Sequence, residues 1–366
     1  MTQAPHDRDV DALLLQYERA RPDFARLTLK LHSLLSDLLV ARGISVHLIE
    51  SRTKEVASFR EKIARASKSY VDPLRELSDL SGIRLIAYYQ DDVDAICSLV
   101  RDEFLVVAES GTDEAESPSQ FGYSSAHFNV QLTDGRAKLP EWGGLAGLAA
   151  EIQVRTVLQH SWAAISHKLQ YKREDDIPRA LRRKLSRLSA LFEIADDEFL
   201  ALRHHSNTIA SQIGERLSVG DQNIALHRLS VAKYVEASET IKQLHEIAAL
   251  VGFRTEREHD ESEDDSETIS EIIQLAGVTG VRTIADLDRT LTQSLSTAEA
   301  YLSRQYHADG TDEPGKWGVT PAFVCVLVLI GAKAQHIRTG FLEELGWDDS
   351  IASRVLEVAK GFASGA

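Results

Sequence analysis

The chain has little cysteine, with only Cys97 and Cys325 in 366 residues, far apart and each inside an apolar stretch. This usage argues against both a disulfide framework and a cysteine-ligated metal site, and it suits a reducing compartment. Long hydrophobic runs are also missing. The most apolar run, residues 322–332, is shorter than the roughly 18 to 20 residues of a membrane-spanning helix, so it predicts a buried helix. The acidic N-terminus lacks the apolar segment of a secretory signal. We therefore expect a cytoplasmic protein with no membrane partner.

Positive charge is scarce as well. The 41 Lys and Arg residues are outnumbered by 56 Asp and Glu residues, which gives a formal net charge of -15. Such a surface repels polyanions as a whole, so any nucleotide or nucleic-acid site must be a local basic cluster. Basic residues that gather at regular spacing are therefore the most informative feature of this sequence.

The first half of the chain alternates strand-like and helix-like segments. Apolar and aromatic residues at 82–89 (GIRLIAYY) predict a buried strand, and three more strands are expected at 104–108, 125–132 and 148–154. A short strand or extended segment is expected at 44–49, a helix at 53–67, a helix capped by Asp91, and a turn at 133–135. These elements predict an α/β (α+β) fold with a mixed β-sheet flanked by helices.

Helical patterns dominate after residue 156, with expected helices at 156–172, from Pro178 onward and within 221–250, and no convincing strand beyond Tyr171. An acidic run at 256–267 (EREHDESEDDSE) reads as a solvated linker. We expect four parts: an α/β domain at 1–215, a helical connector at 216–255, the acidic linker at 256–267, and an all-α accessory region at 268–366.

A basic cluster lies on the helix expected at 53–67. Lys54, Ser58, Lys62 and Arg65 are separated by four, four and three residues, so they would share one helix face. Cations and a hydroxyl on one surface suit a triphosphate, because charge-assisted hydrogen bonds are strong. The alternative is that these residues are only the solvated side of an amphipathic helix.

Two carboxylates stand at strand ends. Asp79 precedes the strand at 82–89, and Glu151 lies in the strand at 148–154. Such a pair can hold Mg²⁺ while substrate phosphates and water complete its coordination. The alternative is a structural salt bridge with Arg84 or Arg155. Tyr123 follows a glycine beside a polar loop, where its ring could stack on a nucleobase or pack in the core.

Five short motifs occur in a distinctive order: Arg52-Thr-Lys54, Asp79-Leu-Ser-Gly-Ile-Arg84, Gly122-Tyr123-Ser-Ser-Ala-His127, Glu151-Ile-Gln-Val-Arg-Thr156 and His167-Lys-Leu-Gln-Tyr171-Lys172. Over about residues 25–205 this order resembles the synthetase domain of the RelA/SpoT homologues, especially the small alarmone synthetases. The resemblance implies a nucleotidyltransferase-like fold. It also implies a Mg²⁺-dependent enzyme that transfers the β,γ-pyrophosphate of ATP to the 3′-hydroxyl of GDP or GTP, making (p)ppGpp and releasing AMP.

The resemblance implies a role for each candidate residue. The residues that sandwich adenine would be Arg52 and Arg84. Those that hold the ATP phosphates would be Lys54, Ser58, Lys62 and Arg65. The catalytic and metal-binding carboxylates would be Asp79 and Glu151. The acceptor pocket would consist of Tyr123, which stacks on the base, together with His127, Gln153 and His160.

One departure from the family pattern leaves the acceptor open. Family members that use GDP or GTP carry arginine and lysine in the loop before the Gly-Tyr pair, whereas the loop here, at 109–120, is acidic. A second hypothesis is therefore a toxic small alarmone synthetase that pyrophosphorylates the 3′ end of tRNA. The basic stretch at 179–187 could contact RNA, or be the solvated face of a long helix. The C-terminal region would then be an in-cis inhibitor.

A third hypothesis is a catalytically inactive domain that serves as a binding module. Retention of both carboxylates, both arginines and the Gly-Tyr pair argues against it. The small synthetases that the chain resembles often form tetramers, so the resemblance also implies a homo-oligomer, which the C-terminal region could block or replace.

Overall fold

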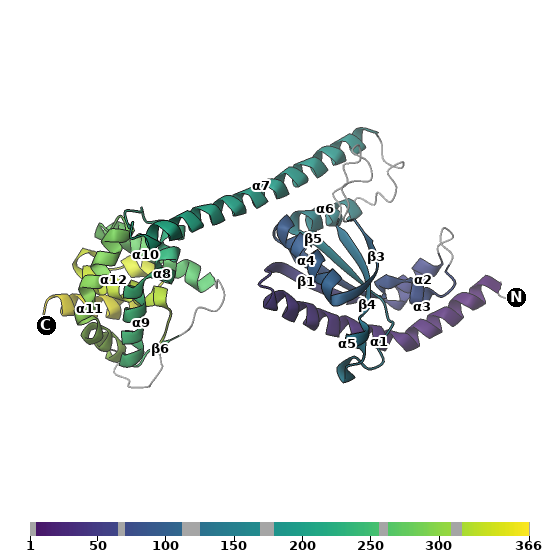
Figure 1. The fold of residues 1–366 in the computed structure, drawn as a ribbon, viewed down its shortest axis with the longest axis horizontal. Coiled ribbons are helices and arrows are strands. Elements are labelled where there is room, and N and C mark those ends of the chain that lie inside the picture. Colours follow the sequence, from purple (N-terminus) through teal and green to yellow (C-terminus); the bar gives the residue numbers. More distant parts are fainter. Residues whose placement is uncertain are drawn as a thin grey trace. The chain divides into compact units, whose positions relative to one another are not determined.

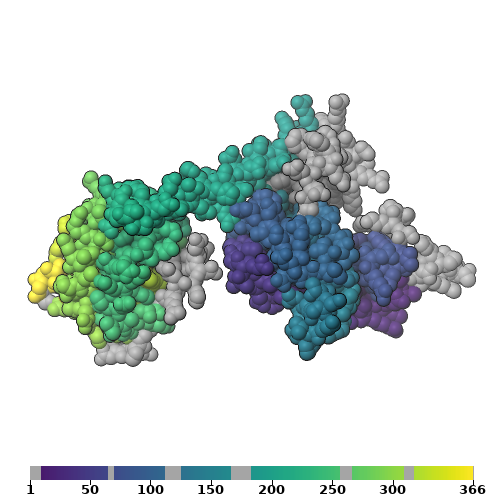
Figure 2. All heavy atoms as spheres, viewed as in Figure 1, coloured from purple at the N-terminus to yellow at the C-terminus, as the bar shows by residue number. Residues whose placement is uncertain are grey.

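A computed structural model describes residues 5–64, 70–111, 125–168, 179–255, 263–308 and 317–365. The chain consists of two compact units, Met1–Arg203 and His204–Ala366, whose elements are drawn as ribbons in Figure 1 and as spheres in Figure 2. Helix α7 (Arg179–Ser218) runs from the first unit into the second. None of the described helices is long and apolar enough to cross a membrane.

The first unit is built on a mixed sheet, as the sequence pattern predicts, and this sheet has five strands. Its order is β1 (Val46–Thr53), β2 (Ser81–Ala87), β5 (Ala150–Thr156), β4 (Ala126–Leu132) and β3 (Phe104–Ser110). Strands β2 and β5 are parallel, and the other neighbours are antiparallel. The five strands include β1, which is longer than the segment expected at 44–49 because Arg52 and Thr53 pair with Gly82 and Ser81.

One face of this sheet is apolar and covered by helices α1 (Pro5–Ala41) and α4 (Gln90–Glu103). In β4 the residues alternate between buried and partly exposed positions, with Phe128 and Val130 buried and His127 and Asn129 partly exposed. Because successive strand residues point to opposite faces, the buried residues pack on α1 and α4. The other face of the sheet is polar.

The elements that connect the strands correct several expectations. Helix α2 (Val56–Ile63) begins after Lys54, because Thr53 still belongs to β1. Thr133 caps a short helix, α5 (Asp134–Ala137), where a turn was expected. Asp91 is not the cap of α4: Tyr89 holds that position, and Asp91 pairs with Arg203 at 2.8 Å. The expected helix at 156–172 is α6 (Val157–Lys168) in the described residues, and Pro178 lies outside them.

The remaining short elements of the first unit are α3 (Pro73–Glu76), η1 (Ser78–Leu80) and η2 (Pro140–Trp142). A second, smaller apolar cluster joins α1 to this region. It contains Tyr17 and Phe24 of α1, Phe59 of α2, Leu80 of η1 and Leu77 just before η1. The Tyr17 and Phe59 rings stack with centroids 4.4 Å apart. This cluster fixes η1 and α2 against the N-terminal helix.

In its described residues the second unit is helical apart from two strands of two residues, β6 (Arg254–Thr255) and β7 (Gly318–Val319), which contradict the expectation of no strand beyond Tyr171. A pair this short has no alternation by which a sequence pattern could reveal it. The helical elements are α8 (Arg228–Ala237), α9 (Glu239–Val251), α10 (Glu263–Thr279), α11 (Ile284–His307), α12 (Pro321–Lys333), η4 (Ala334–His336), α13 (Phe341–Glu344) and α14 (Asp349–Ala363).

The apolar run at 322–332 forms the buried helix α12, which confirms that expectation. The segment expected as a connector, 216–255, shares one core with the C-terminal helices, since Tyr234, Leu244 and Phe253 pack with residues of α10, α11 and α12. The end of the acidic run, residues 263–267, is already part of α10. The structure therefore groups residues 216–255 with the C-terminal region.

We predict different effects on the free energy of unfolding for two glycine-to-alanine changes in the second unit. A Cβ at Gly331, in α12, would lie 2.6 Å from the ring of Tyr301, which is buried. Gly331→Ala should therefore lower the free energy of unfolding by about 1 to 3 kcal/mol. A Cβ at Gly277, in α10, meets nothing within 4 Å, so Gly277→Ala should be neutral or slightly stabilising. Denaturant unfolding of both variants measures this, and equal stabilities would contradict the packing described.

Candidate functional site

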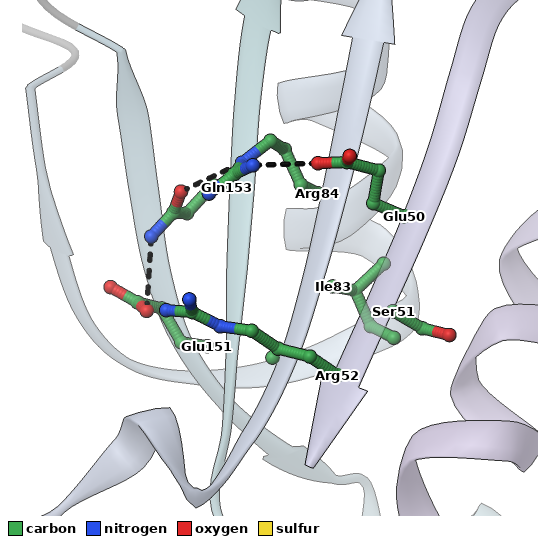
Figure 3. A pocket seen from close by; sticks show the side chains of 8 residues that line it. Glu50, Ser51, Arg52, Ile83, Arg84, Glu151 and Gln153 are labelled. Atoms are coloured by element: carbon green, nitrogen blue, oxygen red, sulfur yellow. Dashed lines mark hydrogen bonds and ion pairs between the residues drawn. The ribbon is translucent and has the colours of Figure 1, made fainter. Parts of the chain in front are cut away.

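Polar side chains from neighbouring strands form two rows across the polar face of the sheet. The strand register places Glu50, Arg84 and Gln153 side by side on β1, β2 and β5. The next row consists of Arg52, Gly82 and Glu151 on the same strands. Figure 3 shows Arg84 reaching toward Glu50 and Gln153, and Arg52 extending toward Glu151. Two arginines, two glutamates and an amide thus meet over three strands.

A cavity of about 220 Å³ lies over these rows, lined by Glu50, Ser51, Arg52, Gly82, Ile83, Arg84, Glu151 and Gln153. Gly82 has no side chain, so the space between Arg52 and Glu151 stays open as part of the cavity. The position of a Cβ on Gly82 would be 3.6 Å from Cγ of Arg52, so the Arg52 side chain lies over this glycine. The two arginines that the resemblance assigns to adenine therefore border one cavity.

Asp79 lies in η1, directly before β2, and contacts two lysines. The Nζ atoms of Lys54 and Lys62 each donate a hydrogen bond to Asp79 Oδ2 at 2.7 Å. Burial alone would raise the pKa of Asp79, but the hydrogen bonds and charges of the two lysines outweigh it, so this pKa is below its ordinary value. Asp79 Oδ1 is buried and accepts no hydrogen bond from the described residues. The carboxylate is thus ionised, with one oxygen still available.

The backbone of Lys54 is fixed by contacts from distant parts of the sequence. Its carbonyl oxygen accepts hydrogen bonds from the Tyr17 hydroxyl at 2.6 Å and from Arg21 Nε at 3.2 Å. Its N–H donates to the carbonyl of Leu80 at 3.0 Å. Lys54 therefore reaches Asp79 from the end of β1, whereas Lys62 reaches it from α2. The expectation that both lysines share one helix face is wrong, although they do converge.

Glu151 is held by β4 and by its own strand. His127 Nδ1 donates to Glu151 Oε1 at 3.1 Å, and Gln153 Nε2 donates to Glu151 Oε2 at 3.1 Å. The His127 bond is the main reason that the pKa of Glu151 is below its ordinary value, against an opposing effect of burial and a smaller one from the negative charge of Asp79. The other ring nitrogen of His127 is 2.9 Å from Ser125 Oγ. Glu151 is therefore ionised and within electrostatic reach of Asp79.

The arginines of the site are linked through Gln153. Arg84 Nη1 donates to Glu50 Oε2 at 2.6 Å, and Arg84 Nε donates to Gln153 Oε1 at 3.3 Å. Arg155 donates to the same Gln153 oxygen. Burial, and then the positive charge of Arg84, lower the pKa of Arg155 to about 10. Among the described residues, neither Asp79 nor Glu151 forms an ion pair with Arg84 or Arg155, so the salt-bridge alternative for the carboxylates is not what the structure shows.

The other candidate residues are only partly placed. His160 lies on α6, and its pKa is lowered by burial and by the nearby charge of Arg84, which places it near the same cluster. Ser58 is exposed on α2. Arg65 and Tyr123 lie outside the described residues. The structure also brings in Glu50, Tyr17 and Ser125, which sequence reasoning missed. Glu50 could have been found by its place two residues before Arg52, on the same side of β1.

Comparison with known proteins identifies the region that carries this site. Residues 51–176 match the family model described as a region found in RelA / SpoT proteins. The chain contains a RelA/SpoT region. The match includes all five motifs from which the resemblance was inferred, so that expectation is confirmed.

Two proteins of Bacillus subtilis (strain 168) are similar to this region. The chain is 29% identical to GTP pyrophosphokinase YjbM over 160 residues, which are 43% of this chain and 72% of the relative. It is 23% identical to GTP pyrophosphokinase YwaC over 156 residues, or 42% and 72%. Among solved structures, small alarmone synthetase 1 from Bacillus subtilis bound to its product pppGpp aligns with a TM-score of 0.42 and 26% identity, covering 52% of this chain and 97% of that one.

We predict that Lys62→Met destabilises the first unit in a pH-dependent way. The variant leaves Asp79, whose side chain is only 15% exposed, with one of its two lysine partners. The free energy of unfolding at pH 7 should fall by about 1 to 3 kcal/mol. Lys242→Met, which removes an ion pair with Glu239 on an exposed helix surface, is the control and should have little effect.

The pH dependence follows from the direction of the Asp79 shift. A lowered pKa in the folded protein gives stability that is present above the unfolded pKa of about 3.9 and is lost as the pH falls through the folded value. The difference between wild type and Lys62→Met should therefore be largest near neutral pH and shrink below about pH 4. A difference that is constant from pH 7 to pH 3 in denaturant unfolding would contradict the assigned pairing.

Proposed function

We propose that the chain is a pyrophosphokinase that transfers the β,γ-pyrophosphate of ATP to the 3′-hydroxyl of GDP or GTP and releases AMP. The observation that carries this proposal is the joint placement of Asp79 between two lysines and of Glu151 in a cavity bordered by Arg52 and Arg84. The names of the two Bacillus subtilis relatives support the same reaction class.

The donor side of the proposal uses the basic residues. Guanidinium planes stack on aromatic rings, so Arg52 and Arg84 would hold adenine between them at the cavity. Each lysine ammonium has three N–H donors, so Lys54 and Lys62 can bind phosphate oxygens while each keeps its bond to Asp79. Ser58 and Arg65 would complete the phosphate site.

The two carboxylates suit a hard divalent cation. Asp79 Oδ1 is buried without a hydrogen-bond partner among the described residues, and Glu151 is ionised within electrostatic reach of it. Mg²⁺ is usually held in proteins by one or two carboxylates together with substrate phosphates, so Asp79 and Glu151 would hold it here. When bound, Mg²⁺ neutralises the charge that develops on the phosphates during transfer.

The acceptor side uses the strands next to Glu151. In the proposed step the acceptor 3′-oxygen forms a bond to the β-phosphorus of ATP, the bond from that phosphorus to the α-phosphate oxygen breaks, and AMP leaves. Glu151 would also receive the hydroxyl proton. Tyr123, His127, Gln153 and His160 would line the acceptor pocket. Such a displacement depends mainly on positioning and charge stabilisation, which a rigid sheet provides.

A second candidate acceptor is the 3′ end of tRNA. Arg183, Lys184 and Arg187 are exposed on α7 and form no ion pair with other described residues, so they could contact an RNA backbone. Against this second candidate, Glu109, the first acidic residue of the segment 109–120, lies in β3 and is paired with Arg101 at 2.6 Å, so its negative charge is partly neutralised. In this second proposal the unit His204–Ala366 would hold the activity in check.

The acceptor can be identified with ATP labelled on its γ-phosphate. The full-length protein is incubated with labelled ATP and GDP, GTP or bulk tRNA, and the label is followed by chromatography. We expect label on GDP or GTP. Label on tRNA alone would overturn the guanine-nucleotide assignment in favour of the second candidate. Transfer to none of the acceptors would contradict the guanine-nucleotide assignment; it is the result expected of an inactive binding module and also of an activity that the unit His204–Ala366 holds in check.

We predict that Asp79→Asn and Glu151→Gln each reduce pyrophosphate transfer by roughly a hundredfold or more, because each removes a negative charge from the reacting centre. Circular dichroism should show that both variants retain the fold. Asp102→Asn, which changes an exposed carboxylate on α4 near Arg42, is the matched control and should keep wild-type activity. Wild-type transfer by either site variant would refute its assigned role.

A further inference from the structure

Arg84 is held from both sides by residues of the neighbouring strands. Glu50 lies directly opposite it on β1, and Gln153 lies directly opposite it on β5. The contact to Glu50 is an ion pair with a nitrogen-to-oxygen distance of 2.6 Å, whereas the contact to the neutral Gln153 is 3.3 Å. The bond to Glu50 joins two opposite charges and is the shorter of the two, so Glu50 holds Arg84 more strongly than Gln153 does. Figure 3 shows both contacts.

Two further positive charges lie near Arg84. Arg155 donates to the same oxygen of Gln153, so two guanidinium groups share one acceptor. Arg52 borders the same cavity. Among the described residues, Glu50 is the one carboxylate that forms an ion pair with any of these three arginines. Glu50 therefore supplies the attraction that keeps Arg84 near Arg155.

We propose that Glu50 is a positioning residue for the donor nucleotide. Its carboxylate holds the guanidinium of Arg84 at the cavity that Arg52 also lines. This inference rests on the proposed function, in which the cavity takes the adenine of ATP. Glu50 acts through Arg84, because its carboxylate is already bonded to that guanidinium. An arginine that is held in place before binding loses less conformational freedom when the ligand binds.

The consequence is an effect on ATP affinity and not on the chemical step. Glu50→Ala should raise the KM for ATP, and the Kd of a non-hydrolysable ATP analogue, roughly three- to tenfold, with kcat within about twofold of wild type. Glu50→Gln should have a KM and a Kd between those of the wild type and of Glu50→Ala, since its amide oxygen can still accept a hydrogen bond from Arg84. Glu103→Ala is the matched control. It breaks a similar ion pair, to Arg136 at 2.7 Å, on α4, which packs on the other face of the sheet.

A double-mutant cycle tests whether Glu50 acts through Arg84. Binding of the ATP analogue is measured by calorimetry for Glu50→Ala, Arg84→Ala and the double variant. We expect Glu50→Ala to weaken binding in the wild-type protein and to have no further effect in the Arg84→Ala background. The same loss in both backgrounds, or unchanged binding by Glu50→Ala alone, would overturn the proposal, as would wild-type protein that does not bind the analogue. Wild-type protein that binds the analogue but transfers no pyrophosphate would refute the proposed function. The cycle would then still decide whether Glu50 acts on nucleotide binding through Arg84.

Discussion

The hydrogen-bonded register of β1, β2, β5 and β4 is the constraint on which the site depends. It places Glu50, Arg84, Gln153 and His127 in one row across four strands. Since successive residues of a strand face opposite sides, this polar row exists only because the alternate positions are apolar and packed against α1 and α4. A slip of one residue would exchange the two faces, so burial of the apolar face fixes the polar one.

Ion pairs place the part of the site that the strand register does not fix. Asp79 does not lie on the sheet face itself but in the short element before β2, where the ends of β1 and α2 bring Lys54 and Lys62 to it. A buried carboxylate between two lysines is stable only while both partners stay, and their charges keep it ionised. Strand ends and a short helix thus assemble a basic site in a chain whose net charge is -15.

Much of this fold could be predicted from local pattern, because β2, β4 and β5 carry apolar alternation and the motif residues sit on them. The start of α2 could not. Thr53 and Lys54 are held by pairing with Ser81 and by a hydrogen bond from Tyr17, which lies 37 residues away in sequence. Such long-range contacts leave no trace in a local periodicity. The role of Glu50 was also missed, since it belongs to no motif, and that of Ser125 was missed because it acts through its contact with His127.

In the second unit, too, the packing partners of the helices could not be predicted from local pattern. The helical character of the C-terminal region and the burial of α12 follow from composition, whereas the grouping of α8 and α9 with α10, α11 and α12 does not, because an amphipathic helix specifies that it packs but not on which partner.

In the proposed reaction the polar face of the sheet transfers a pyrophosphate and not a single phosphate. The most direct test is to quantify the adenine nucleotides that the full-length protein produces from ATP in the presence of acceptor, by anion-exchange chromatography. We expect one AMP for each modified acceptor molecule. Formation of ADP in place of AMP, in the same proportion to modified acceptor, would contradict it.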